Sequence, residues 1–161
     1  MPKSKAPKAT RPHMPGYGIS TKKKGTLPWK WAEQRLAKTR QYYLATVHPE
    51  GRPHVMPVWG LWLNGSFYFS TGKTSRKARN LALNHNCVVC SDDTSQAVIV
   101  EGRVEMIIDV GALKPVFAAY KKKYKMDVSE MGEPFYRVRP RAAFGLFEKK
   151  FVDTATKWLF A

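Results

Sequence analysis

Acidic residues and cysteines are scarce in this chain, and long apolar runs are missing. No apolar stretch approaches the ~18–20 residues that a membrane-spanning helix needs. The N-terminal region has no apolar signal segment, so we expect a cytoplasmic protein without a membrane partner. The 161 residues are 43% hydrophobic, which suits one domain with a core that needs no disulfide bonds.

The two cysteines, Cys87 and Cys90, form a C-x-x-C pattern that is also seen in zinc and redox sites. The surrounding segment NCVVCS is typical of a strand, where positions i and i+3 point to opposite faces. No second Cys/His pair lies at zinc-site spacing. We therefore expect two free thiols and no metal site.

Positive charge is concentrated near the N-terminus. The net charge is +16, and residues 1–30 hold eight Lys or Arg and no acid, so this segment carries half of the excess. Residues 1–25 are rich in Pro, Gly and Lys and lack apolar periodicity, which predicts a flexible basic arm before a domain at 26–161. Deleting the arm is expected to leave the fold intact. A basic nucleic-acid-binding module is an alternative, but no recognition motif supports a specific nucleic-acid partner.

The most informative segment is SFYFSTGKTSRKARNL at 66–81. Alternating residues from Ser66 to Thr71 predict a strand that breaks at Gly72, and Thr74 or Ser75 is a suitable helix N-cap. Basic residues near a helix N-terminus are unfavourable because that end carries partial positive charge. Such a cluster is consistent with a phosphate-binding site, or alternatively with a solvated basic face. Its cations are Lys73, Arg76, Lys77 and Arg79.

Turn signals and apolar patterns predict a mainly β protein with short helices, arranged as a closed or partly closed antiparallel barrel. Helices are expected at about 27–40, 74–84 and 114–125, the last one starting near Lys114 because of Pro115. Strands are expected at 41–47, 52–63, 66–71, 87–91, 96–109, 135–138, 142–148 and 154–160. The run VMPVWGLWL is apolar on both faces, so we expect a second copy of the chain to cover Trp59 and Leu61.

Four segments in order resemble the pyridoxamine 5′-phosphate oxidase-like family, including its deazaflavin (coenzyme F-420)-dependent branch. They are YYLATVHPEGRPHVMPVWGLW, FYFSTGKTSRKARNL, QAVIVEGRVE and TATKWLF. The resemblance implies a homodimeric split β-barrel that binds a flavin at the subunit interface. It also implies FMN as cofactor, with deazaflavin coenzyme F-420 as the alternative.

The resemblance assigns site residues one by one. Ser75, Arg76 and Lys77 fall on the family's phosphate-binding segment. The strand that contains residues 56–59 would line the flavin ring, and the strand end at 70–71 would approach the cofactor. Gln96 lies one position from the family's ring-contacting Gln, and the C-terminal segment resembles the ending of the coenzyme F-420-linked branch. These positions are Met56, Pro57, Val58, Trp59, Ser70, Thr71, Gln96, Lys157 and Trp158.

The chain also departs from true pyridoxamine phosphate oxidases. Residues 56–61 read Met-Pro-Val-Trp-Gly-Leu and supply neither of the two cations of the oxidase pattern. The oxidase's C-terminal Arg-Leu-x-Pro is missing as well. The resemblance therefore implies a flavin- or deazaflavin-dependent oxidoreductase acting on an unknown small molecule, with no identifiable catalytic acid or base. A non-catalytic carrier of flavin or haem is the alternative.

Overall fold

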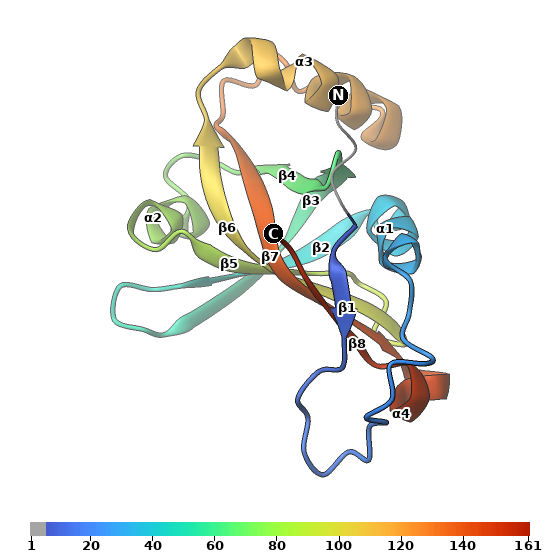
Figure 1. The fold of residues 1–161 in the computed structure, drawn as a ribbon. Coiled ribbons are helices and arrows are strands. Elements are labelled where there is room, and N and C mark those ends of the chain that lie inside the picture. Colours follow the sequence, from blue (N-terminus) through green and yellow to red (C-terminus); the bar gives the residue numbers. More distant parts are fainter. Residues whose placement is uncertain (1–5) are drawn as a thin grey trace.

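The computed structural model describes residues 6–161 and is mostly β, with short helices around the strands (Figure 1). The strands are β1 (Lys8–Thr10), β2 (Gln41–Val47), β3 (Pro53–Leu63), β4 (Ser66–Ser70), β5 (Asn86–Cys90), β6 (Gln96–Ile107), β7 (Phe135–Phe147) and β8 (Thr156–Leu159). The helices are α1 (Trp29–Lys38), α2 (Arg76–Leu83), α3 (Val110–Tyr124) and α4 (Phe151–Thr154), with a 3₁₀ turn at Glu148–Lys150.

Six antiparallel strands close into a barrel. The strand order β7-β4-β3-β2-β5-β6 is completed by direct pairing of β6 with β7. The two halves of β7 have different partners on its other edge, since Phe135–Val138 pairs with β4 and Ala142–Gly145 pairs with β8. The expected antiparallel barrel is thereby confirmed, and β8 and β1 extend it beyond β7.

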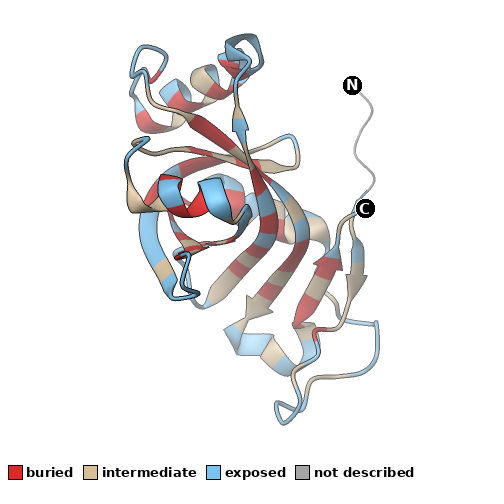
Figure 2. Ribbon diagram, turned by 90° about the vertical axis from the view of Figure 1, so that its left-hand side faces the viewer, coloured by how far each residue is buried: buried red, intermediate tan, exposed pale blue. Residues whose placement is uncertain are grey.

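Alternating side chains of the strands fill the barrel. Leu44, Phe67, Phe69, Val89 and Val98 are fully buried in one cluster. Figure 2 shows buried residues spread along the strands of the barrel and exposed residues on the helices and loops around it. Burial of this apolar surface is the main source of stability for the fold.

A second cluster lies outside the barrel, beneath α3. Leu61, Phe135, Val116 and Tyr120 pack there with Tyr124. Leu61 is therefore covered by a helix of its own chain, so the expectation that a second copy covers it is wrong. Trp59 stays 42% exposed.

The N-terminal segment differs from the expected flexible arm. Lys8–Thr10 pairs with β8, and the Arg11 guanidinium donates hydrogen bonds to the carbonyl oxygens of Lys22, Lys24 and Ala155. This edge pairing needs no apolar periodicity, because its free energy comes from main-chain hydrogen bonds and from the Arg11 contacts. Deletion of residues 1–24 would remove these bonds, so we now expect it to destabilise the protein. Residues 1–5, including Lys3 and Lys5, lie outside the described part.

Two element boundaries also differ from expectation. The strand over 135–147 is continuous because the β6–β7 register shifts at Glu101/Gly102, opposite Pro140, which has no N–H for a regular ladder. Helix α3 begins at Val110, before Pro115, because the Asp109 side chain accepts a hydrogen bond from Gly111 N at 2.8 Å.

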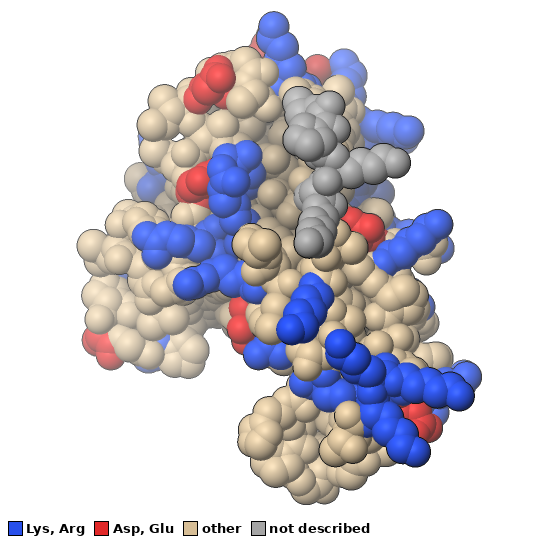
Figure 3. All heavy atoms as spheres, viewed as in Figure 1, with Lys and Arg blue, Asp and Glu red and all other residues tan. Residues whose placement is uncertain are grey.

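Cys87 and Cys90 are free thiols, as expected. Burial raises the pKa of Cys87 to about 12. In residues 6–161, no helix is long and apolar enough to cross a membrane. Lys and Arg far outnumber acids on the face shown in Figure 3.

Lys123 anchors the C-terminal end of α3 to the barrel. Its Nζ donates to Tyr42 Oη at 2.8 Å and to the Gly60 carbonyl at 2.9 Å. Burial, together with the nearby Arg40 charge, lowers its pKa to about 8, while Asp92 acts weakly in the opposite direction. The charged form of Lys123 therefore lowers the stability of the folded protein.

Stability should rise with pH because of Lys123. Between pH 8 and about 10 the unfolded chain keeps a proton on this lysine that the folded chain loses, which favours folding as pH increases. We expect a gain of about 1 kcal/mol after solvent screening, absent in Lys123→Met. Urea unfolding of both proteins across this range measures it. The buried cysteines contribute to the pH dependence with the opposite sign, and this contribution cancels when the two proteins are compared. Parallel curves of unfolding free energy against pH for the two proteins would contradict the prediction.

Candidate functional site

The candidate site is built around the start of α2. Ser75 is the N-cap, and its Oγ accepts a hydrogen bond from Ala78 N at 3.2 Å and lies 3.1 Å from Thr71 Oγ1. The first N–H groups of a helix have no partner within the helix. Those of Arg76 and Lys77 are consequently left available to an anion. The predicted start of this helix is therefore confirmed.

Beside this helix start lies a cavity of about 420 Å³. Its walls come from β3, the end of β4, the start of α2, the end of α3 and the loop that follows α3. The lining residues are Pro57, Val58, Trp59, Ser70, Thr71, Gly72, Lys77, Tyr120, Met126, Val128, Met131 and Glu133. Its size and mixed apolar and polar lining fit an organic ligand.

Lys77 is the basic group of the cavity. Burial lowers its pKa, and it forms no ion pair with the described carboxylates. A partly buried ammonium without an anionic partner is unfavourable unless a ligand neutralises it. Lys77 and the N-terminus of α2 therefore place positive charge on this side of the cavity.

Aromatic contacts fix the wall formed by β3 and α3. Trp59 stacks on Tyr124 with ring centroids 4.7 Å apart, and Tyr120 Oη donates to the Trp59 carbonyl at 2.9 Å. Tyr124 Oη also donates to the Gly60 carbonyl at 2.8 Å. These contacts hold Trp59 at the rim with a large apolar surface exposed.

The loop between α3 and β7 closes the remaining side. Ser70 Oγ donates to the Pro134 carbonyl at 2.9 Å, and Lys73 N donates to Glu133 Oε2, also at 2.9 Å. Both bonds follow from the β4–β7 register, in which Ser70 pairs with Phe135. Sequence analysis did not assign this loop to the site.

Lys157 lies at the far end of a row of paired residues on the outer face of the sheet. We call this row, with one residue from each of β3, β2, β5, β6, β7 and β8, the outer strip. Its members are Pro57, Tyr43, Cys90, Ile99, Phe144 and Lys157. Lys157 is not among the residues that line the cavity of its own chain.

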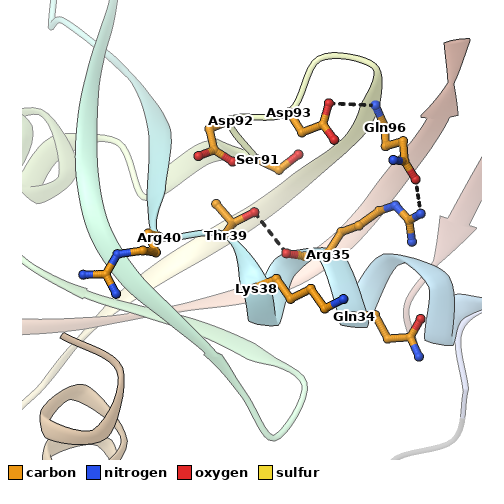
Figure 4. Close-up of a pocket in the computed structure, with 9 residues that line it drawn as sticks. All are labelled: Gln34, Arg35, Lys38, Thr39, Arg40, Ser91, Asp92, Asp93 and Gln96. Atoms are coloured by element: carbon orange, nitrogen blue, oxygen red, sulfur yellow. Dashed lines mark hydrogen bonds between the residues drawn. The ribbon is translucent and has the colours of Figure 1, made fainter. Parts of the chain in front are cut away.

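Gln96 and Trp158 also lie away from the cavity. Gln96 accepts a hydrogen bond from Arg35 in a separate pocket of about 470 Å³ between α1 and the β5–β6 turn (Figure 4). Trp158 is fully buried against Trp29 and Gly145. Neither residue lines the cavity within one chain.

The remaining predicted residues surround the cavity without lining it. Met56 is 44% exposed on β3, next to Pro57. Lys73, Arg76 and Arg79 lie at or beside the start of α2. No group of three or more potential metal-ligating side chains occurs within residues 6–161.

Tyr120 and Glu133 had no local sequence signal as site residues. Each is brought to the cavity by long-range packing of α3 and by the pairing of β4 with β7. Only a prediction of the α3 packing and of the β4–β7 pairing would have identified these two residues.

Solved structures share this architecture at low sequence identity. An F420 reductase is 23% identical, with 69% of this chain and 94% of that chain covered at a TM-score of 0.58. A nimC/nimA family protein from Clostridium acetobutylicum is 16% identical, with coverages of 80% and 91% and a TM-score of 0.63. A conserved hypothetical protein from Mycobacterium tuberculosis is 18% identical, with coverages of 82% and 92% and a TM-score of 0.66.

No curated protein matches the chain significantly. The family model described as pyridoxamine 5′-phosphate oxidase matches residues 30–156. This range contains β2–β7, all of α2 and α3, and every residue that lines the cavity. The barrel and its cavity therefore coincide with the matched segment, and the chain belongs to the pyridoxamine 5′-phosphate oxidase family.

Proposed function

We propose that this protein is a flavin-dependent oxidoreductase that transfers hydride between a bound flavin and a small molecule. The observation that carries the proposal is the partly buried Lys77 at the start of α2, which forms no ion pair within residues 6–161 and lies beside a cavity with aromatic and apolar walls. A flavin phosphate has the charge that Lys77 requires. The flavin ring has the flat apolar surface that the Trp59 side of the cavity can cover.

The residues present fit such a cofactor. Ser75, Arg76 and Lys77 would hold its phosphate with backbone N–H groups and basic side chains. A bound flavin supplies hydride transfer at its ring, so the protein needs to position the ring and restrict water rather than add a strong acid or base. Trp59 and the loop residues Met126, Val128 and Met131 would provide that cover.

FMN remains the first candidate, with deazaflavin coenzyme F-420 as the alternative. The compact cationic cluster at the start of α2 suits one phosphate near the ring. The absence of basic residues at 56–61 removes two contacts of the oxidase pattern and favours the deazaflavin. The similarity in fold to an F420 reductase is compatible with both.

We also propose that the protein acts as a homodimer. Tyr43, Val55 and Trp59 are 42–54% exposed on the outside of β2 and β3, where a partner copy would bury them. Lys157 lies across the outer strip from the cavity of its own chain. Packing two copies through the outer strip would place the partner's C-terminal segment near that cavity.

The test is to identify the chromophore. The purified protein is expected to be yellow, and mass spectrometry of the compound released by denaturation should return FMN or the deazaflavin. Reduction of the bound chromophore by a chemical donor, followed by its oxidation with candidate acceptors, then separates an oxidoreductase from a carrier. A colourless protein that binds neither cofactor on titration would contradict the proposal.

A further inference from the structure

Glu133 is the acidic group of the cavity. It belongs to the loop between α3 and β7, and its carboxylate contacts the loop that leads into α2. Its Oε2 accepts a hydrogen bond from Lys73 N at 2.9 Å. Glu133 forms no ion pair with a described Lys or Arg, and it lines the same cavity as Lys77. A negative charge therefore stands next to the groups expected to bind a phosphate.

The position of this carboxylate is built into the fold. Pro134 follows Glu133 and restricts its backbone to extended conformations. The Pro134 carbonyl is in turn tied to Ser70 Oγ at 2.9 Å. Two hydrogen bonds from neighbouring positions thus hold the Glu133 side of the loop against the end of β4 and the following turn.

This arrangement has two consequences for an incoming phosphate. The Lys73 N–H already donates to Glu133, so this donor is not available to a third terminal oxygen of the phosphate. Electrostatic repulsion also scales with the product of the charges, so a doubly charged group is penalised twice as much as a singly charged one. A phosphomonoester is close to doubly charged above its second pKa of about 6, whereas a phosphodiester carries one charge.

We propose that Glu133 is a specificity-determining residue for the charge of the bound phosphate. This role rests on the flavin-binding function proposed above. Glu133 shifts the preference of the site from a doubly charged phosphomonoester toward a singly charged phosphodiester. Both groups occur in flavin-type cofactors, so Glu133 bears directly on which cofactor the site accepts.

Three ligands that share one ring test this role at pH 8: FMN, its phosphate methyl ester and riboflavin. They differ in phosphate charge, being doubly charged, singly charged and uncharged. Glu133→Gln removes the charge and keeps an oxygen that can accept the Lys73 N–H bond. We expect it to tighten FMN binding about tenfold and ester binding about threefold, the square root of tenfold, without changing riboflavin binding.

Glu130→Gln is the matched control, because Glu130 lies exposed on the same loop and should leave all three affinities unchanged. Glu133→Asp, which retains the charge, should keep the wild-type ranking of FMN and ester. Equal changes for FMN and ester, or weaker binding of all three ligands by Glu133→Gln, would show a purely structural role and overturn the inference. Failure of the wild type to bind any of the three would instead contradict the proposed function itself.

Discussion

Replacing Lys77 with methionine is expected to weaken FMN binding about ten- to hundredfold. A charge-assisted hydrogen bond to phosphate contributes ~1.5–3 kcal/mol, which corresponds to that range of affinity. The unliganded protein should be unchanged or slightly more stable, because burial of the Lys77 ammonium disfavours its charged form. Fluorescence titration with FMN and urea unfolding of the unliganded protein measure the two effects.

Two comparisons make the Lys77 result specific. Lys38→Met removes the same charge from an exposed position at the end of α1 and should leave the affinity for FMN unaltered. Riboflavin, which has no phosphate, should bind wild type and Lys77→Met equally. Comparable losses of FMN affinity in Lys77→Met and Lys38→Met would point to a general effect of net charge and remove Lys77 from the phosphate site.

Trp158→Ala should have the largest effect on stability, with the free energy of unfolding lowered by ~3–5 kcal/mol. The Trp158 ring is fully buried, contacts Trp29 edge-on with centroids 5.2 Å apart, and covers Gly145 where no Cβ would fit. Its removal leaves a cavity between α1 and β7 that neighbouring side chains cannot fill. Urea unfolding followed by tryptophan fluorescence, with circular dichroism as a second probe, measures the change.

Leu159→Ala is the control for Trp158, since the next residue on β8 is 42% exposed and should cost less than about 1 kcal/mol. Trp158→Phe should recover part of the loss by filling some of the cavity. A stable Trp158→Ala protein with weakened flavin binding would restore the earlier interpretation of Trp158 as a cofactor contact.

The sequence located the start of α2 and its cations because these signals are local. An N-cap serine, a broken strand and adjacent basic residues lie within about ten positions of one another, so no long-range information is needed. The strand order along the barrel was less accessible. Alternation and turn signals predicted most strands, but closing the barrel also needs the pairing of β4 with β7, which are separated in the chain by α2, β5, β6 and α3.

Other positions depend on distant contacts. Trp158 and Gln96 were assigned to the site by resemblance, and within one chain tertiary packing places the first in the core and the second beside Arg35, so their assignment stays a prediction. Strand β1 was not predicted, because edge pairing through backbone hydrogen bonds does not require a characteristic side-chain pattern.

By itself, the sequence determined the barrel class and the basic helix start of this protein, because both depend on neighbouring residues. Tertiary structure alone decided what faces that helix start. The β4–β7 register brings Glu133 to the Lys73 N–H, and the packing of α3 brings Tyr120 to Trp59. Such contacts depend on the free energy of packing distant segments, which no short stretch of sequence encodes.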